Sequence, residues 1–288
     1  MMQSFESYRP YLFSIAYRML GSAMDAEDMV QETFLRYQST PPEAIRSPKA
    51  FLTTILTRLC MDQLHLARRK RETYLGPWLP EPMLTNDAAA QTNPEERVDR
   101  YETISLAFLM LLEQLQPFER AVFLLREVFD YEYAEIAAFL DKSEAACRQS
   151  FSRAKKHLAD HQPRFPASPD THRQMLAAFL RAVQVGDLTA LTDLLAEDVT
   201  LWADGGGKVK GAATRPLFGR LAVARFSVGA TRRFLPEEYR VELAEVNGEP
   251  ALVVRGADRA YVVLTIDVEA QRIRTIRIIA NPEKLAHV

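Results

Sequence analysis

Apolar residues recur every three or four positions through much of the first 160 residues, which is the period of amphipathic helices. The pattern predicts helices over about 5–19, 26–37 and 48–72. Gly21 interrupts the first stripe, and Asp25 is a suitable cap for the second helix. The amino-terminal 73 residues are therefore expected to be all helical.

The pattern changes over 74–100, where proline and small polar residues predict a linker. The first part of this linker is unusually apolar, with Tyr74, Leu75, Trp78 and Leu79 among the prolines. We expect these side chains to dock on a neighbouring domain. Helical periodicity then resumes, and we place a second helical domain at 101–162.

Residues 171–288 follow a second proline-containing break and form a third region. This region opens with helical stretches at 171–186 and 188–196 and then turns to β-branched and alternating segments. Five strands are expected, in the segments VTLWAD, RVELAEV, PALVVRG, AYVVLTID and RIRTIRII. Helices followed by mostly antiparallel strands predict an α+β domain.

The second helical domain contains a helix-turn-helix pattern. A short helix is expected over Tyr133–Leu140, then a turn in which Ser143 caps the next helix and Glu144 lies in its first turn. In that helix we expect four apolar side chains to face inward, namely Ala146, Phe151, Ala154 and Leu158. The outer face then carries Arg148, Gln149, Ser152, Arg153, Lys155 and Lys156. Arg and Gln read base edges and Lys neutralises phosphate, so this face suits a DNA major groove, although a solvated face of a plain bundle is the alternative.

Two helices of the amino-terminal domain have opposite charge. The helix at 26–37 is acidic, whereas residues 47–72 contain six Lys or Arg side chains against two acidic ones, a surplus of four positive charges. Opposite charges on consecutive helices suggest one protein partner and one nucleic-acid partner.

The order of these segments resembles the extracytoplasmic-function group of bacterial RNA polymerase sigma factors. AEDMVQETFLRY resembles the helix that binds the β′ clamp of core polymerase, and FLTTILTRLCMDQLHLARRKRE resembles the helix that recognises the minus-ten element. LQPFERAVFLLREVFDYEYAEIAAFLDKSEAACRQSFSRAKKHL resembles region 4, which contacts the β flap and reads the minus-35 element.

The resemblance implies a set of contact residues. The implied polymerase contacts are Asp25, Glu27, Asp28, Gln31 and Glu32. The implied promoter contacts are Asp62, Gln63, His65, Arg68 and Arg69 at the minus-ten element, and Arg148, Gln149, Ser152, Arg153 and Lys156 at the minus-35 element.

The third region resembles a SnoaL-like cone, an extension that the sigma-J-like subgroup of these factors carries. The segments that carry this resemblance are YLGPWLPEP, WADGGGKV and NPEKL. The resemblance implies regulation in cis, without a separate anti-sigma factor, and we expect the three segments to meet at an interface between the tail and the sigma region. The implied regulatory residues are Trp78, Pro80, Trp202, Asp204, Gly205, Gly206, Gly207, Lys208, Asn281 and Lys284. Trp202 is equally suited to line the cone or to anchor an interface, and Asp204 is a weak candidate base.

Composition narrows the function further. No run of eighteen apolar residues or secretory signal is present, which favours the cytoplasm over a membrane. Two cysteines fit a reducing compartment, and the glycine run lacks the residues of a phosphate loop. His157 and His161 have the spacing of a metal pair but lack a third ligand, so no metal or cofactor is expected.

Two other classes stay open on sequence alone. One is an enzyme, a cyclase or isomerase built on the cone, and the other is a repressor that uses only the helix-turn-helix. A small ligand in the cone is compatible with each of these classes.

Overall fold

The computed structural model describes residues 5–85, 104–159, 167–235 and 238–288. It divides into two compact units, each with its own core. The first unit contains the described residues up to Glu72, Ile104 and residues 108–159. The second contains residues 73–85, 105–107 and the described residues from 167 onward. The apolar first part of the linker therefore belongs to the same unit as the carboxy-terminal domain.

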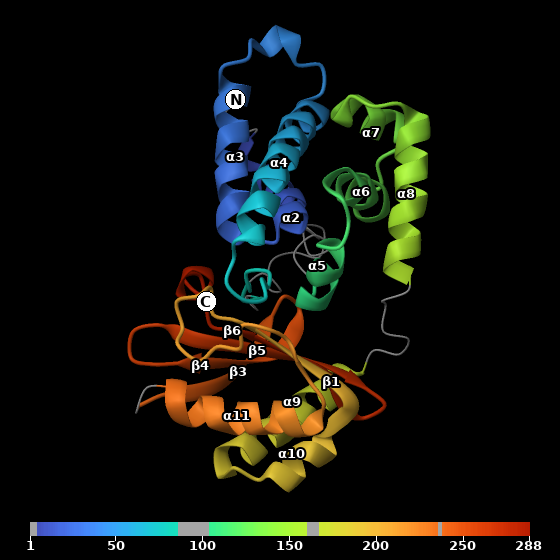
Figure 1. Cartoon of the computed structure of the whole chain (residues 1–288). Helices are drawn as coiled ribbons and strands as arrows, with labels where there is room; N and C mark the ends of the chain where they lie inside the picture. Colours follow the sequence, from blue (N-terminus) through green and yellow to red (C-terminus); the bar gives the residue numbers. More distant parts are fainter. Residues whose placement is uncertain (1–4, 86–103, 160–166, 236–237) are drawn as a thin grey trace. The chain divides into compact units, whose positions relative to one another are not determined.

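Helices are the regular elements among the described residues before 160, in agreement with the predicted periodicity (Figure 1). They are α2 (Arg9–Leu20), α3 (Ala23–Gln38), η1 (Pro42–Ala44), α4 (Pro48–Glu72), α5 (Leu106–Leu112), α6 (Pro117–Phe123), η4 (Leu124–Val128), α7 (Tyr133–Leu140) and α8 (Glu144–Ala159). The element η4 is a π-helical turn that continues α6, and the sequence did not predict it.

The start of α3 differs from the prediction. Ser22, not Asp25, is the cap, because its hydroxyl accepts a hydrogen bond from the Asp25 backbone N–H at 3.1 Å. Gly21 ends α2 in the left-handed conformation, at a φ of 68°. The helix therefore begins at Ala23, three residues earlier than expected, and Asp25 lies in its first turn. A carboxylate there still interacts favourably with the helix dipole.

The second unit is an α+β domain with one six-stranded sheet. Its elements are α9 (Pro169–Val185), α10 (Leu188–Leu194), β1 (Leu195–Asp204), β2 (Leu217–Phe218), α11 (Arg220–Phe234), β3 (Arg240–Val246), β4 (Glu249–Arg255), β5 (Ala260–Glu269), β6 (Arg272–Ile279) and η5 (Pro282–Lys284). The strand order is β2-β1-β6-β5-β4-β3, and only the β1–β6 pair is parallel.

The three helices α9, α10 and α11 lie on one face of this sheet (Figure 1). Leu201, Leu252, Ile266 and Ile276 point from the strands into the core that they share with the helices. The neighbouring residues along each strand point to the opposite face, because side chains alternate across a sheet. The sequence analysis missed α11, whose interior contains Gly229.

Candidate polymerase, promoter and linker sites

The helix-turn-helix forms as the sequence predicts. Asp141 ends α7 with a φ of 52°, and the Ser143 hydroxyl accepts a hydrogen bond from the Ala146 backbone N–H at 3.2 Å. The inward face of α8 differs in part from the prediction. Ala154 and Leu158 are buried as expected, while Ala146 and Phe151 are only half-buried and their places in the core are taken by Cys147 and Ser150.

The predicted outer face of α8 is solvent-exposed along its whole length, at Arg148, Gln149, Ser152, Arg153, Lys155 and Lys156. Arg148 pairs with Glu144 at 2.5 Å, and its guanidinium lies 5.0 Å from the centre of the Tyr133 ring. Arg153 pairs with Glu119 at 3.2 Å. These contacts hold two long cationic side chains in place while leaving them accessible.

On α3, the five candidate polymerase contacts do not share one environment. Asp28 and Gln31 are exposed, whereas Glu27 pairs with Arg9 at 2.6 Å and Glu32 pairs with Arg36 at 2.8 Å. The fifth candidate, Asp25, is half-buried and accepts a hydrogen bond from the Gln63 side chain at 3.2 Å.

The structure adds two residues to the α3 surface that the sequence analysis missed. Met24 is 51% exposed and Leu35 is 57% exposed. Their spacing places them on the same helix face as Asp28 and Gln31. Apolar residues among polar ones on a solvent-facing stripe are typical of a protein interface. The sequence does contain a signal for these two residues. Met24 and Leu35 are apolar but lie outside the periodic stripe of α3 that is buried.

On α4, the candidate minus-ten residues divide into exposed and engaged ones. Asp62 and His65 are exposed, and Gln63 is half-buried against Asp25. Arg68 is exposed but donates a hydrogen bond to the Gln116 side chain, which precedes α6. The side chain of Arg69 lies outside the described residues.

Further polar contacts join the amino-terminal helices to the helix-turn-helix within the first unit. Arg58 on α4 donates to the carbonyl of Phe139 at 2.9 Å. Arg120, 2% exposed, donates to the carbonyl of Arg18 at 2.9 and 3.1 Å and pairs with Glu113. Burial lowers the pKa of Arg120 to about 9, so its guanidinium stays charged at neutral pH.

The second unit contains a buried carboxylate at the end of β1, that of Asp204. The Tyr74 hydroxyl donates to Oδ1 at 2.5 Å and the Gly206 N–H donates to the same oxygen at 3.0 Å. The Leu79 N–H donates to Oδ2 at 2.8 Å, and Nζ of Lys284 lies 2.7 Å from that oxygen. All four donors bind the Asp204 carboxylate, and this arrangement favours a structural role for it over that of a catalytic base.

The linker and the carboxy-terminal segment share this cluster. The Lys284 ammonium also donates to the Leu79 carbonyl and lies 4.0 Å from the centre of a Trp78 ring, a cation–π contact. The Asn281 side chain donates to the Tyr74 hydroxyl at 3.0 Å. Burial, followed by the bond to Asp204, raises the pKa of Tyr74. The structure therefore brings YLGPWLPEP, WADGGGKV and NPEKL together. All three segments belong to the second unit, whereas we expected an interface with the sigma region. We call this cluster the linker clamp.

The glycines of WADGGGKV allow the close approach that the clamp requires. Gly206 and Gly207 have φ values of 60° and 71°, and a side chain at Gly206 would collide with Asn281. A Cβ at Gly205 would lie 2.6 Å from that of Ala212. These positions therefore need glycine for backbone conformation and for space.

The linker has a second attachment at the opposite edge of the sheet. Thr85 donates its N–H to the Glu245 carbonyl at 2.9 Å, and Asn247 donates its N–H to the Met83 carbonyl at 2.8 Å. These bonds add a short antiparallel strand to the free edge of β3, between Leu84 and Val246. An exposed strand edge is thereby covered.

The remaining candidates have less specific surroundings. Pro80 is buried in the linker. Trp202 is half-buried and pairs in register with Arg277, on the face of β1 opposite to Leu201, so it does not line the cone. Lys208 is exposed and pairs with Glu283.

The structure also locates other groups that the sequence analysis considered. His157 is exposed, and His161 lies outside the described residues. Within the described ranges, no group of three or more potential ligands could hold a metal ion, and no helix is long and apolar enough to cross a membrane. Cys60 and Cys147 are free and buried, and burial raises the pKa of both thiols.

Comparisons with known proteins match the two helical domains to known families. Sigma-70 region 2 matches residues 4–72, and sigma-70 region 4 matches residues 105–158. The ECF RNA polymerase sigma factor SigJ of Mycobacterium tuberculosis is 38% identical, over 97% of this chain and 91% of its own length. The probable ECF sigma factor SigI of the same species is 32% identical, over 98% of this chain and 93% of its own length. The crystal structure of SigJ superposes with a TM-score of 0.74 at 36% identity, covering 99% of this chain and 98% of that one.

Two sigma-70 regions in this order, followed by the α+β cone, define a sigma factor with a carboxy-terminal extension. The chain belongs to the extracytoplasmic-function (ECF) family of RNA polymerase sigma factors.

Proposed function

We propose that the chain binds core RNA polymerase in the cytoplasm and directs it to promoters that have specific minus-ten and minus-35 elements. The α3 surface formed by Met24, Asp28, Gln31 and Leu35 meets the β′ clamp. This assignment is supported by the exposure of all four side chains on one helix face. The proposed role extends the one that the sequence suggested for Asp28 and Gln31, adding apolar contacts that are favourable at a protein interface.

The two promoter elements are read by different helices in this proposal. On α4, Asp62 and His65 are accessible to an unpaired minus-ten strand. On α8, Arg148, Gln149 and Arg153 face base edges, and Lys156 faces phosphate. The β flap binds the helix-turn-helix domain as in the family that the sequence resembles.

The contacts between the two helical regions indicate that the described conformation is a closed one. Minus-ten and minus-35 elements are about 25 base pairs apart, or about 85 Å along B-form DNA at 3.4 Å a step. In the first unit, Arg58 and Arg68 on α4 instead hydrogen-bond to the helix-turn-helix domain. Engagement of both elements therefore requires these contacts to break, which frees Arg68 for DNA.

Regulation in cis is the role we propose for the linker clamp. The observation that carries it is the number of bonds from the linker to the carboxy-terminal domain, at Asp204, Asn281 and Lys284. Because the linker connects the two sigma regions, fixing its first part on the cone restricts how far they separate. No separate anti-sigma factor is needed in this scheme.

Run-off transcription with bacterial core polymerase tests the proposal. The full chain is compared with a chain that ends at Pro163, since the first unit has a core of its own. Promoter-specific transcripts from either version are expected, and the difference between the two versions gives the sign of the regulation. Absence of transcripts and of polymerase binding with both versions would contradict the proposal.

A further inference from the structure

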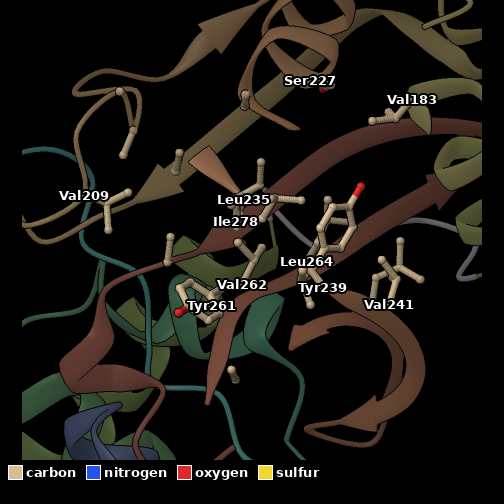
Figure 2. A pocket seen from close by; sticks show the side chains of 18 of the residues that line it. Val183, Val209, Ser227, Leu235, Tyr239, Val241, Tyr261, Val262, Leu264 and Ile278 are labelled. Atoms are coloured by element: carbon tan, nitrogen blue, oxygen red, sulfur yellow. The ribbon is translucent and has the colours of Figure 1, made fainter. Parts of the chain in front are cut away.

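The cone encloses a cavity of about 450 Å³ between the sheet and two of its helices. Apolar side chains line most of it, including Phe179 from α9, Phe226 from α11 and Leu252 from β4. Leu264 from β5 and Ile278 from β6 also line it, as Figure 2 shows. A cavity of this size and polarity is in the range that proteins use for small organic ligands. The buried core of the domain lies beside it and does not fill it.

The charged side chains that line the cavity are all cationic. Its lining residues include Lys208, Lys210 and Arg259 and, among the described residues, no carboxylate and no histidine. All three cations are exposed, so they lie where the cavity opens to solvent. Lys208 is already paired with Glu283, while Lys210 has no ion pair among the described residues.

Arg259 is held in place beside the cavity. Its guanidinium lies 4.8 Å from the centre of the Tyr261 ring, and Gly256 leaves room for that ring, since a Cβ there would be 2.5 Å from Tyr261 Cε2. A lining without a carboxylate or a histidine lacks the side chains that most often transfer protons in a cyclase or isomerase. It suits binding, with apolar contact inside and a cationic group at the opening.

We propose that this cavity binds an amphiphilic organic anion, with an apolar body inside and a carboxylate or similar group near Lys210 and Arg259. Burial of the body provides most of the affinity, because apolar area is removed from water. Lys210 and Arg259 make the cavity selective for a ligand that carries a negative charge. A neutral ligand of the same shape is expected to bind more weakly.

The cavity and the linker clamp are built from the same two segments. At the end of β1, Ala203 lines the cavity and Asp204 holds the linker. At the end of β6, Ala280 and Pro282 line the cavity, while Asn281 holds Tyr74. Neighbouring residues face opposite ways along an extended backbone, so one short segment serves both sites.

Ligand binding in the cavity is therefore coupled to attachment of the linker at the clamp. This second part of the inference rests on the proposed regulation in cis. A molecule in the cavity lies against residues 208–212, Ala280 and Pro282, which follow Asp204 and flank Asn281 in the chain. Any difference in ligand affinity between the clamped and unclamped states shifts the balance between them. The full chain thereby senses the ligand at the linker.

Two matched dyes test the site directly on the full chain. Anilinonaphthalene sulfonate is an anion with a phenyl and a naphthyl group, and phenylnaphthylamine has the same aromatic groups without the sulfonate. We expect saturable binding of both dyes, with the sulfonate bound more tightly. The double substitution Lys210→Ala and Arg259→Ala is expected to weaken the sulfonate about three- to tenfold, as for two exposed ion pairs, and to leave the neutral dye unchanged.

A substitution that fills the cavity tests whether the dyes bind inside it. Ala230 on α11 lines the cavity, so Ala230→Trp is expected to abolish binding of both dyes. Gly229 is its neighbour on the helix with open space around it, so Gly229→Trp is the matched control and is expected to bind normally. Circular dichroism and thermal unfolding verify that both variants fold. Equal affinity for the two dyes overturns the anion assignment, and binding that survives Ala230→Trp overturns the site.

Hydrogen exchange of the linker tests the coupling. A saturating concentration of the sulfonate dye is expected to change the exchange rate of peptide 74–85, which contains the Leu79 N–H bonded to Asp204. The Ala230→Trp variant must show no such change. An unchanged rate in the wild-type chain overturns the coupling. Sigma activity is measured separately by run-off transcription without dye, so failure of the ligand site is distinguishable from failure of the proposed function.

Discussion

The carboxylate of Asp204 has lost its hydration shell, and hydrogen bonds and the Lys284 ammonium replace it. Asp204→Asn removes the negative charge and leaves this ammonium buried without its counter-ion. We expect a loss of about 3–5 kcal/mol in the stability of the second unit, as for a buried ion pair broken on one side. Chemical denaturation followed by circular dichroism measures the change.

Two further variants sharpen this test. Asp198→Asn, also on β1, removes an exposed carboxylate that pairs with Arg274, and it is expected to cost less than 1 kcal/mol. Adding Lys284→Met to Asp204→Asn removes the orphaned charge and is expected to recover part of the loss. Equal effects of the substitutions at positions 198 and 204 would show that the clamp is not a major source of stability.

Glu249 is expected to make the stability of the second unit depend on pH. Burial, followed by the nearby Asp267 carboxylate, raises its pKa from 4.5 to about 7. The folded state thus holds this proton more tightly, so the stabilising effect is complete below pH 4.5 and is lost as the pH rises through about 7. The shift corresponds to at most about 3 kcal/mol.

Replacing this carboxyl by a neutral amide isolates its effect. Glu249→Gln is expected to raise the melting temperature relative to the wild type at pH 8 and to have little effect at pH 4.5. The exposed Glu238 provides the control substitution Glu238→Gln, which should not alter the pH profile. A Glu249→Gln melting curve that stays parallel to the wild type across this range would argue against a raised pKa.

At the scale of single elements, the α8 helix provides a test of promoter recognition. Lys156→Ala is expected to weaken binding to all promoter sequences similarly and to lower the slope of log affinity against log salt concentration by about one. Gln149→Ala is expected instead to relax base preference at one position of the minus-35 element, by about 1–3 kcal/mol. Affinities of the full chain bound to core polymerase, measured at several salt concentrations, separate these outcomes. Arg173→Ala, on α9, is the control and should change neither quantity.

The linker is attached to the sheet at two places. The Leu79 N–H bonds to Asp204 on β1, and the Thr85 N–H bonds to Glu245 on β3, which is four strands away from β1 in the sheet order. Pro80 and Pro82 lie between these attachments and favour an extended backbone.

Thr85→Pro tests this attachment, because proline has no N–H to donate to the Glu245 carbonyl. We expect faster hydrogen exchange at the β3 edge, including the Asn247 amide that donates to Met83. Thr85→Val keeps the N–H and loses only the hydroxyl bond to Gly248, so it should have a smaller effect. If both variants exchange at the same rate, the added strand does not hold the linker.

Elements with a clear period and clear end signals could be predicted from the sequence. The segments of α7, β3 and β6 were predicted with their observed bounds, because the apolar period of α7 ends at the turn that begins with Asp141 and β-branched residues alternate along the strands. The Asp25 cap was wrong because Ser22 and Asp25 are both good caps and only the fold decides between them. The linker clamp was expected as a meeting of three motifs, but the central place of Asp204 depends on contacts between residues more than a hundred positions apart.

At the scale of the whole molecule, the first unit must open before promoter binding, and Tyr131 is a suitable point at which to weaken the closed form. Its hydroxyl lies 2.5 Å from that of Tyr11 on α2 and 3.2 Å from that of Thr53 on α4. Tyr131→Phe removes both hydrogen bonds between the two sigma regions and keeps the ring. At about 1 kcal/mol for each net hydrogen bond, we expect the ratio of open to closed molecules to rise about thirtyfold.

Energy transfer between dyes attached through Gln31→Cys on α3 and Ser152→Cys on α8 measures this opening, since both positions are exposed and both native cysteines are buried. Tyr131→Phe is expected to lower the transfer efficiency without core polymerase and to speed the first round of transcription. Tyr133→Phe is the matched control, because that ring contacts Arg126, Arg148 and Phe151 within the helix-turn-helix domain. If Tyr131→Phe changes neither the transfer nor the rate, the contacts between the regions do not limit opening. Restriction by the linker clamp would then be the remaining control, and Asp204→Asn in the same labelled chain should lower the transfer by itself.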